Sequence, residues 1–129
     1  MIALDTNVVV RFLTRDDAAQ AARARRLVEG NEVMVAATVL LETEWVLRAA
    51  YGFAPQQIHQ GLLALLGIPT LHSDAPDRVS QALDWYASGM DFADALHLAF
   101  SQSAERFATF DGKLVRFASR IEGLTVVTP

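Results

Sequence analysis

Four acidic residues stand out because their sequence positions suggest confined surroundings, where a freely solvated carboxylate is not expected. They are Asp5, Glu42, Asp94 and Asp111. A carboxylate that faces an apolar environment needs a cation, a metal ion or strong hydrogen-bond donors. If the four converge, a hard divalent cation with oxygen ligands, Mg²⁺ or Mn²⁺, would neutralise their repulsion. An acidic site that holds such a cation suits substrates that bring their own negative charge, above all phosphodiesters.

Asp5 and Asp111 are also open to a simpler interpretation. Asp5 begins the run Asp-Thr-Asn, and Asp111 lies in the run Thr-Phe-Asp-Gly-Lys. Each precedes a segment with helical character, and aspartate caps a helix by accepting hydrogen bonds from its first backbone amides. For each of these two residues taken alone, capping and site chemistry both remain open.

The helix predicted over residues 38–50 carries two glutamates that should face almost opposite directions. At about 100° per residue, Glu42 falls in the same arc as the apolar Trp45. Glu44 falls close to Arg48, and such an (i, i+4) pair belongs on a solvated face. We therefore expect Glu42 to point inward and Glu44 outward. The alternative for Glu42 is a side chain that reaches back to a neighbouring backbone donor.

Asp94 lies in a segment that is apolar almost all round, which is typical of a buried helix. The helix is expected to run from Asp91 to about Ser103, with Asp91 as its cap. Asp94 could complete that capping arrangement, but it shares a face with Leu98 and is expected to point inward. Three histidines are scattered along the chain and are expected to be ordinary surface or core residues: His59, His72 and His97.

Short apolar strands alternate with helices along the whole chain, and no repeat or linker interrupts them, so residues 1–129 are expected to form one domain. The expected strands are 1–4, 33–36, 69–72, 107–110 and 124–127; the expected helices are 6–13, 16–29, 38–50, 55–67, 73–87, 91–103 and 112–119. Ser73 or Asp74 would cap the helix that ends at Ala87. The alternation predicts a small three-layer α/β/α domain with a central parallel sheet of about five strands. Ligands bind beyond the carboxyl ends of such strands.

Composition narrows the class of protein. The 52% hydrophobic and 20% charged content excludes intrinsic disorder, and the absence of cysteine excludes disulfides and thiolate zinc sites. The longest apolar run, 33–41, is about half of the ~18 residues that a membrane helix needs. No signal peptide is apparent, so a soluble cytoplasmic protein with no membrane partner is expected.

The net charge of −4, from 15 acids and 11 cations, at first argues against a nucleic-acid partner. If four of the acids belong to one metal-holding site, however, eleven acids remain against eleven cations. The acidity would then describe the site, and the rest of the molecule would be formally neutral.

In their order and spacing, these motifs resemble the PIN-domain nucleases, specifically the VapC-type toxins of bacterial toxin–antitoxin pairs. The resemblance covers nearly the whole chain. It rests on Asp5-Thr6-Asn7, on Glu42, on Asp91-Phe92-Ala93-Asp94-Ala95-Leu96 and on Thr109-Phe110-Asp111. It implies a Mg²⁺- or Mn²⁺-dependent endoribonuclease that cleaves single-stranded or looped RNA. It also implies a homodimer and a small antitoxin protein whose C-terminal segment covers the acidic cleft.

The resemblance also implies a role for each residue of the site. Asp5 and Asp94 would be the principal metal ligands, and Asp111 would ligate directly or through water. Glu42 would orient or deprotonate the attacking water. The polar supports would be Asn7, Thr109 and Asp91, although capping already explains Asp91. The cations nearest to these acids in the sequence, and so expected to meet phosphates, are Arg11, Arg15 and Arg116.

Three other functions stay open as alternatives. A response-regulator receiver domain has a similar length and an acidic Mg²⁺ pocket, but it pairs acids after its first strand and has a lysine after its last. Here Asp5 stands alone, and the only lysine, Lys113, opens a helix. A haloacid-dehalogenase-type phosphatase would have a second aspartate where this chain has Asn7. The third alternative is a non-catalytic module that keeps the fold only to bind a partner.

Overall fold

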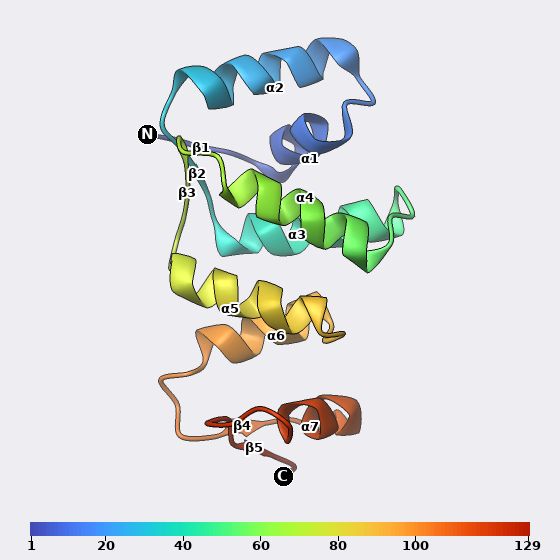
Figure 1. The fold of residues 1–129 in the computed structure, drawn as a ribbon, viewed down its shortest axis with the longest axis vertical. Helices are drawn as coiled ribbons and strands as arrows, with labels where there is room; N and C mark the ends of the chain where they lie inside the picture. The colour runs from blue at the N-terminus through green and yellow to red at the C-terminus, as the bar shows by residue number, and fades with distance from the viewer.

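The computed structural model describes residues 1–129 and contains seven helices and five short strands (Figure 1). In chain order they are β1 (Ile2–Ala3), α1 (Thr6–Thr14), α2 (Ala18–Gly30), β2 (Val33–Val35), α3 (Ala37–Ala49), α4 (Pro55–Leu66), β3 (Leu71–Ser73), α5 (Pro76–Ala87), α6 (Phe92–Phe100), β4 (Phe107–Ala108), α7 (Gly112–Ala118) and β5 (Val126–Val127). Every expected element is present. The α6 helix ends at Phe100, three residues before the expected end, because a turn follows it.

Aspartates begin several of the helices. Asp17 caps α2 by accepting a hydrogen bond from the amide of Gln20, and Asp111 caps α7 by accepting from the first amides of that helix. Such caps satisfy amides that have no partner inside the helix. Asp74 departs from expectation, because it does not cap α5. Its Oδ1 accepts a 2.7 Å hydrogen bond from the amide of Ala37 and so caps α3, whose own N-cap residue is an alanine.

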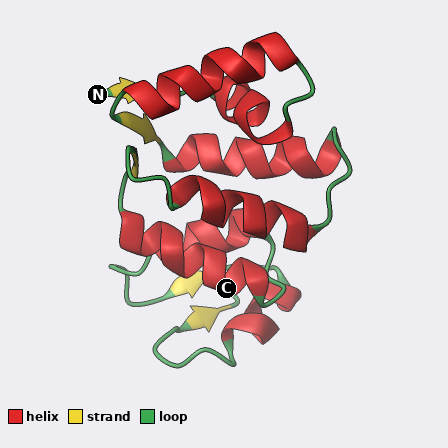
Figure 2. Cartoon of the chain, turned by 45° about the horizontal axis from the view of Figure 1, so that its top comes forward, coloured by secondary structure: helices red, strands yellow, loops and turns green.

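All strand pairs are parallel, but the predicted single sheet is wrong: the five strands form two sheets. One sheet has the order β1-β2-β3 and the other contains β4 and β5, and Figure 2 shows them at separate places in the molecule. Strands of two or three residues contribute few ladder hydrogen bonds, so the packing of helices decides where they lie. In Figure 1 the α5–α6 pair lies between the two sheets. The α/β class with parallel strands and covering helices is confirmed.

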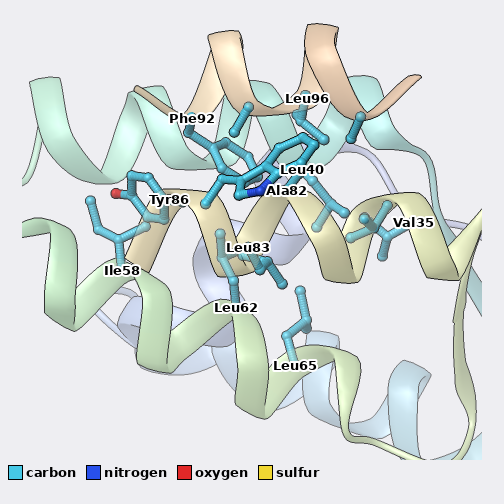
Figure 3. Close-up of a cluster of buried hydrophobic side chains, with 14 of the residues drawn as sticks. Val35, Leu40, Ile58, Leu62, Leu65, Ala82, Leu83, Tyr86, Phe92 and Leu96 are labelled. Carbon is cyan, nitrogen blue, oxygen red and sulfur yellow. The ribbon is translucent and has the colours of Figure 1, made fainter. Parts of the chain in front are cut away.

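The core lies mainly between helices. Figure 3 shows side chains from α3, α4, α5 and α6 meeting around Phe92 and Leu83. Phe92 is 1% exposed and stacks edge-on against Tyr86. Burial of each large apolar side chain stabilises the fold by about 1.5–3 kcal/mol. This core fixes the start of α6, which carries two of the acidic residues singled out from the sequence. No helix combines the length and apolar character that spanning a membrane requires.

Candidate functional site

The first turn of α6 brings acidic residues together with the start of α7. Asp91 caps α6, and its Oδ1 accepts a 3.1 Å hydrogen bond from the amide of Asp94. The pKa of Asp94 is raised, first by partial burial and then by the negative charges of Asp91 and Asp111, while His97 opposes the shift. Asp94 therefore lies in the electrostatic field of both other carboxylates. We call Asp91, Asp94 and Asp111 the acidic cluster.

Asp111 is held in place from both sides. Its Oδ1 accepts hydrogen bonds from the amides of Lys113 and Leu114, at 2.9 and 3.3 Å. Its own amide donates to Oγ1 of Thr109 at 3.0 Å. The capping interpretation of Asp111 is therefore correct as local structure. It does not exclude a role in the cluster, because capping occupies one carboxylate oxygen.

Asp5 lies outside the acidic cluster, at the carboxyl end of β1. Its Oδ1 accepts a 2.8 Å hydrogen bond from the amide of Thr6, which begins α1. Oγ1 of Thr6 is buried and has no hydrogen-bond partner, so an unmet donor lies directly beside Asp5. Asn7 is exposed and lines a groove of about 590 Å³ together with Arg11 and Arg23. The structure thus places Asp5 and Asn7 with α1, and the acidic cluster with α6 and α7.

The predicted directions of the two glutamates on α3 are reversed. Glu42 is exposed, whereas Glu44 is only 2% exposed. Trp45 was expected to mark the buried side of the helix, but it is 57% exposed. The charge of Glu44 is met by Arg48 and by the hydroxyl of Tyr86 on α5.

The i,i+4 pairing of Glu44 and Arg48 is confirmed, with Nε of Arg48 2.9 Å from the carboxylate. The face assigned to the pair was wrong. One signal for the true orientation is present in the sequence: Leu40, Glu44 and Leu47 recur at helical spacing, and both leucines are buried. The second partner could not be foreseen, because Tyr86 belongs to another helix.

The three arginines expected at phosphates differ in their surroundings. Arg11 is engaged: its guanidinium donates to Asp16 at 3.1 Å, to the Tyr51 hydroxyl at 3.0 Å and to Gln20 at 2.7 Å. The charge of Asp16 also raises the pKa of Arg11. The side chains of Arg15, at the end of α1, and Arg116, on α7, are exposed and form no ion pair.

The acidic residues are of the ligand type that binds divalent metal ions, but the structure does not place three of them around one ion. Carboxylate oxygens are the ligands that Mg²⁺ and Mn²⁺ prefer. The pKa of Asp94 is raised mainly by burial and further by the charges of Asp91 and Asp111, and a bound cation would oppose both effects. However, no group of three or more aspartate, glutamate or histidine side chains is placed to hold a metal ion. The structure does not gather Asp5, Glu42, Asp94 and Asp111 into one coordination site.

The structure is an α/β domain with parallel strand pairs and covering helices. It carries carboxylates at the starts of α1, α6 and α7 that could bind a cation or take part in a reaction. Comparison with protein families identifies the family. The PIN domain model matches residues 2–119, and the chain belongs to the PIN domain family. PIN domains are generally nucleases, and the nucleases among them typically use divalent metals. No curated protein gives a significant match.

Proposed function

We propose that this PIN-domain protein is a divalent-metal-dependent endoribonuclease that cleaves phosphodiester bonds in RNA. The observation that carries the proposal is the acidic cluster in a chain of a nuclease-type family: the pKa of Asp94 is raised by partial burial and then by the charges of Asp91 and Asp111. Perturbed pKa values cluster at functional sites, where catalytic and ligand-binding carboxylates lie close together. The order of the acidic motifs along the chain supports the same conclusion.

The proposed site consists of Asp5, Glu42, Asp94 and Asp111. Asp5, Asp94 and Asp111 are the proposed ligands of Mg²⁺ or Mn²⁺, and they would have to draw together to bind it, because the structure does not place three such side chains around one ion. A bound ion would lower the pKa of water and stabilise negative charge on a phosphoryl group. Glu42 has an exposed carboxylate that can accept a proton from the attacking water.

Two neighbours support the aspartates of this site. Asp91 fixes the backbone of Asp94 through the hydrogen bond to its amide, and Thr109 fixes the backbone of Asp111. Asn7 is a proposed third support beside Asp5. Asp91 and Thr109 therefore act on the orientation of the ligands, and Asn7 is proposed to hold either a carboxylate or a phosphate.

The substrate contacts proposed from the structure are electrostatic. Arg15 and Arg116 are exposed without ion-pair partners, so each can meet a phosphate directly. Arg11 must exchange its bonds to Asp16 and Tyr51 before it can do so. We therefore expect Arg15 and Arg116 to contribute more to RNA affinity than Arg11.

The biological role proposed is that of a cytoplasmic toxin in a type II toxin–antitoxin pair. It is supported by the resemblance of the four acidic motifs to VapC-type toxins. Two partners go with this role: a second copy of the chain in a homodimer, and a small antitoxin protein that covers the acidic residues. Induced expression should arrest growth of a bacterial host, and the Asp94→Asn variant should not. Light scattering of the purified chain tests the dimer.

The enzymatic proposal is tested by incubating the protein with a mixed pool of single-stranded RNA in Mg²⁺, in Mn²⁺ and in chelator. Cleavage is expected with either metal and not with chelator. The Asp5→Asn variant should be inactive. Asp84→Asn is the matched control, because Asp84 is an exposed aspartate on α5 outside the proposed site. Equal cleavage by wild type and Asp5→Asn would remove Asp5 from the site.

A further inference from the structure

Glu44 is a buried charge to which the proposed reaction assigns no role. It is one of only three buried polar or charged residues, and the only ionisable one among them. Its carboxylate accepts from Nε of Arg48 at 2.9 Å, from Nη2 of Arg48 at 3.4 Å and from the Tyr86 hydroxyl at 3.2 Å. A buried ion pair is weak evidence for stability, because apolar residues of similar volume often replace it without loss. Stability alone therefore does not explain this group.

The hydrogen bond from Tyr86 leads from Glu44 to the acidic cluster. It is buried and joins α3 to α5 across 42 residues of sequence. The ring of Tyr86 in turn meets the ring of Phe92 edge-on, with centroids 5.1 Å apart and planes at 60°. Figure 3 shows these two side chains beside one another in the core. Phe92 is the first residue of α6 and directly follows Asp91.

Arg48 provides a second link from Glu44 to the cluster. The charge of Asp91 contributes to the raised pKa of Arg48, so the guanidinium lies within electrostatic reach of that carboxylate. The larger contribution comes from Glu44 itself, whose hydrogen bonds orient the guanidinium. Glu44 thus holds the hydroxyl of the tyrosine whose ring meets the first residue of α6, and it orients a guanidinium on which the charge of Asp91 acts.

We propose that Glu44 is a positioning residue for the nuclease site. By holding the Tyr86 hydroxyl and the Arg48 guanidinium, it fixes the first turn of α6 and with it the carboxylates of Asp91 and Asp94. This inference rests on the proposed function for its catalytic consequence. Its structural consequence, the order of the first turn of α6, is independent of that function and can be measured separately.

The structural arm of the test measures hydrogen exchange at the amide of Asp94, which donates to Asp91 in the ordered first turn. The variants are Glu44→Gln and Tyr86→Phe, each of which weakens the same link. Leu65→Ala is the matched control, because it destabilises the core from α4 without touching the link. Exchange at Asp94, relative to the slowest amides of the same variant, should rise in Glu44→Gln and Tyr86→Phe but not in Leu65→Ala.

The catalytic arm measures kcat and KM for RNA cleavage at a temperature where every variant is folded. Loss of a group that orients metal ligands typically lowers activity about 10- to 100-fold. We expect this loss in kcat for Glu44→Gln and Tyr86→Phe, with KM close to that of the wild type. The double variant should lose little more than either single one, since both interrupt one link. Leu65→Ala should keep the wild-type kcat.

The two arms separate the possible failures. Unchanged relative exchange at Asp94 in both variants overturns the positioning role, whatever the activity. Wild-type kcat in Glu44→Gln overturns it as well. A wild-type protein that cleaves no RNA overturns the proposed function instead, and altered exchange at Asp94 would then still support the structural link from Glu44.

Discussion

The opposite surroundings of Glu42 and Glu44 lead to a quantitative prediction about stability. The two glutamates lie two residues apart on α3, and replacement by glutamine changes each in the same way: it removes the charge and preserves the shape. Glu44→Gln should destabilise the protein by about 2 kcal/mol. Glu42→Gln should change the free energy of unfolding by less than about 0.5 kcal/mol, as is usual for an exposed position.

The magnitude for Glu44 follows from its three hydrogen bonds. A hydrogen bond to a charged group contributes about 1.5–3 kcal/mol, and glutamine keeps only one oxygen to accept these bonds. A glutamine oxygen in the place of Oε2 can keep the bonds from Nε of Arg48 and from the Tyr86 hydroxyl, but as weaker bonds to a neutral acceptor, and the amide nitrogen then faces Nη2 of Arg48. Arg48 moderates the cost, because its side chain is 46% exposed and can turn to water. Together these effects give about 2 kcal/mol rather than the 3–5 kcal/mol of a fully buried broken pair.

Urea unfolding followed by circular dichroism measures both variants. With a slope of about 2 kcal/mol/M, the midpoint of Glu44→Gln should fall by about 1 M, and that of Glu42→Gln should stay within about 0.25 M of the wild type. Equal midpoints for wild type and Glu44→Gln would refute the buried network. A larger loss in Glu42→Gln than in Glu44→Gln would refute the assigned faces of α3.

Three further predictions follow from individual side chains. Burial and the charge of Glu44 raise the pKa of Tyr86 well above its ordinary value, so the native state keeps a proton that the unfolded state loses above about pH 10. Stability should therefore fall above that pH, and Tyr86→Phe should lessen the fall in urea titrations between about pH 9 and 11. An equally steep loss of stability with pH in Tyr86→Phe would contradict this prediction. Burial and the neighbouring carboxylates raise the pKa of Asp94 in the native state. Wild type should therefore gain stability relative to Asp94→Asn as the pH falls from 7 through that raised pKa towards the unfolded value near about 4. Thermal melts of both proteins test this, and a difference in melting temperature that does not vary with pH contradicts it. Oγ1 of Thr43 is buried without a hydrogen-bond partner, so Thr43→Val should be neutral or stabilising by up to about 1 kcal/mol. A fall of more than about 1 kcal/mol in the free energy of unfolding, measured with urea, would show that the hydroxyl forms a hydrogen bond.

Local features of the sequence were sufficient to predict the elements. The order of seven helices and five strands follows from apolar runs, turn residues and caps. Asp91 caps the helix assigned to it, the capping interpretation of Asp111 is correct, and Asp17 caps α2. Each of these interactions joins residues only two or three positions apart. Periodicity and capping describe such short-range contacts directly.

Interactions between distant residues were not predictable in the same way. Asp74 caps a helix that begins 37 residues earlier, and the Tyr86 hydroxyl donates a hydrogen bond to a glutamate 42 residues away. In both cases the sequence shows a polar residue and a plausible nearby partner, while the actual partner is supplied by the tertiary fold. The directions predicted for the two glutamates of α3 are wrong for this reason: Trp45 suggests the buried side, and the local sequence does not show that Tyr86 lies beside Glu44.

The division of the strands into two sheets is a further long-range outcome. Alternation of strands and helices predicts parallel pairing, and the pairing is parallel. Which strands become neighbours depends on how α5 and α6 pack, because strands this short contribute little pairing energy. The same packing decides which acids meet. The charge of Asp111 acts on Asp94, whereas Asp5 follows β1 in the three-stranded sheet.

Metal-dependent cleavage of RNA at the acidic residues is measured directly by the cleavage rate of an end-labelled single-stranded RNA by purified protein in Mn²⁺. Three proteins should be compared side by side: wild type, Asp94→Asn and the matched control Asp84→Asn. Wild type and Asp84→Asn should cleave at equal rates that chelator abolishes, and Asp94→Asn should lose at least about 100-fold. Cleavage by Asp94→Asn at the wild-type rate would show that Asp94 does not serve the reaction, and cleavage by wild type in excess chelator would show that the reaction needs no metal ion.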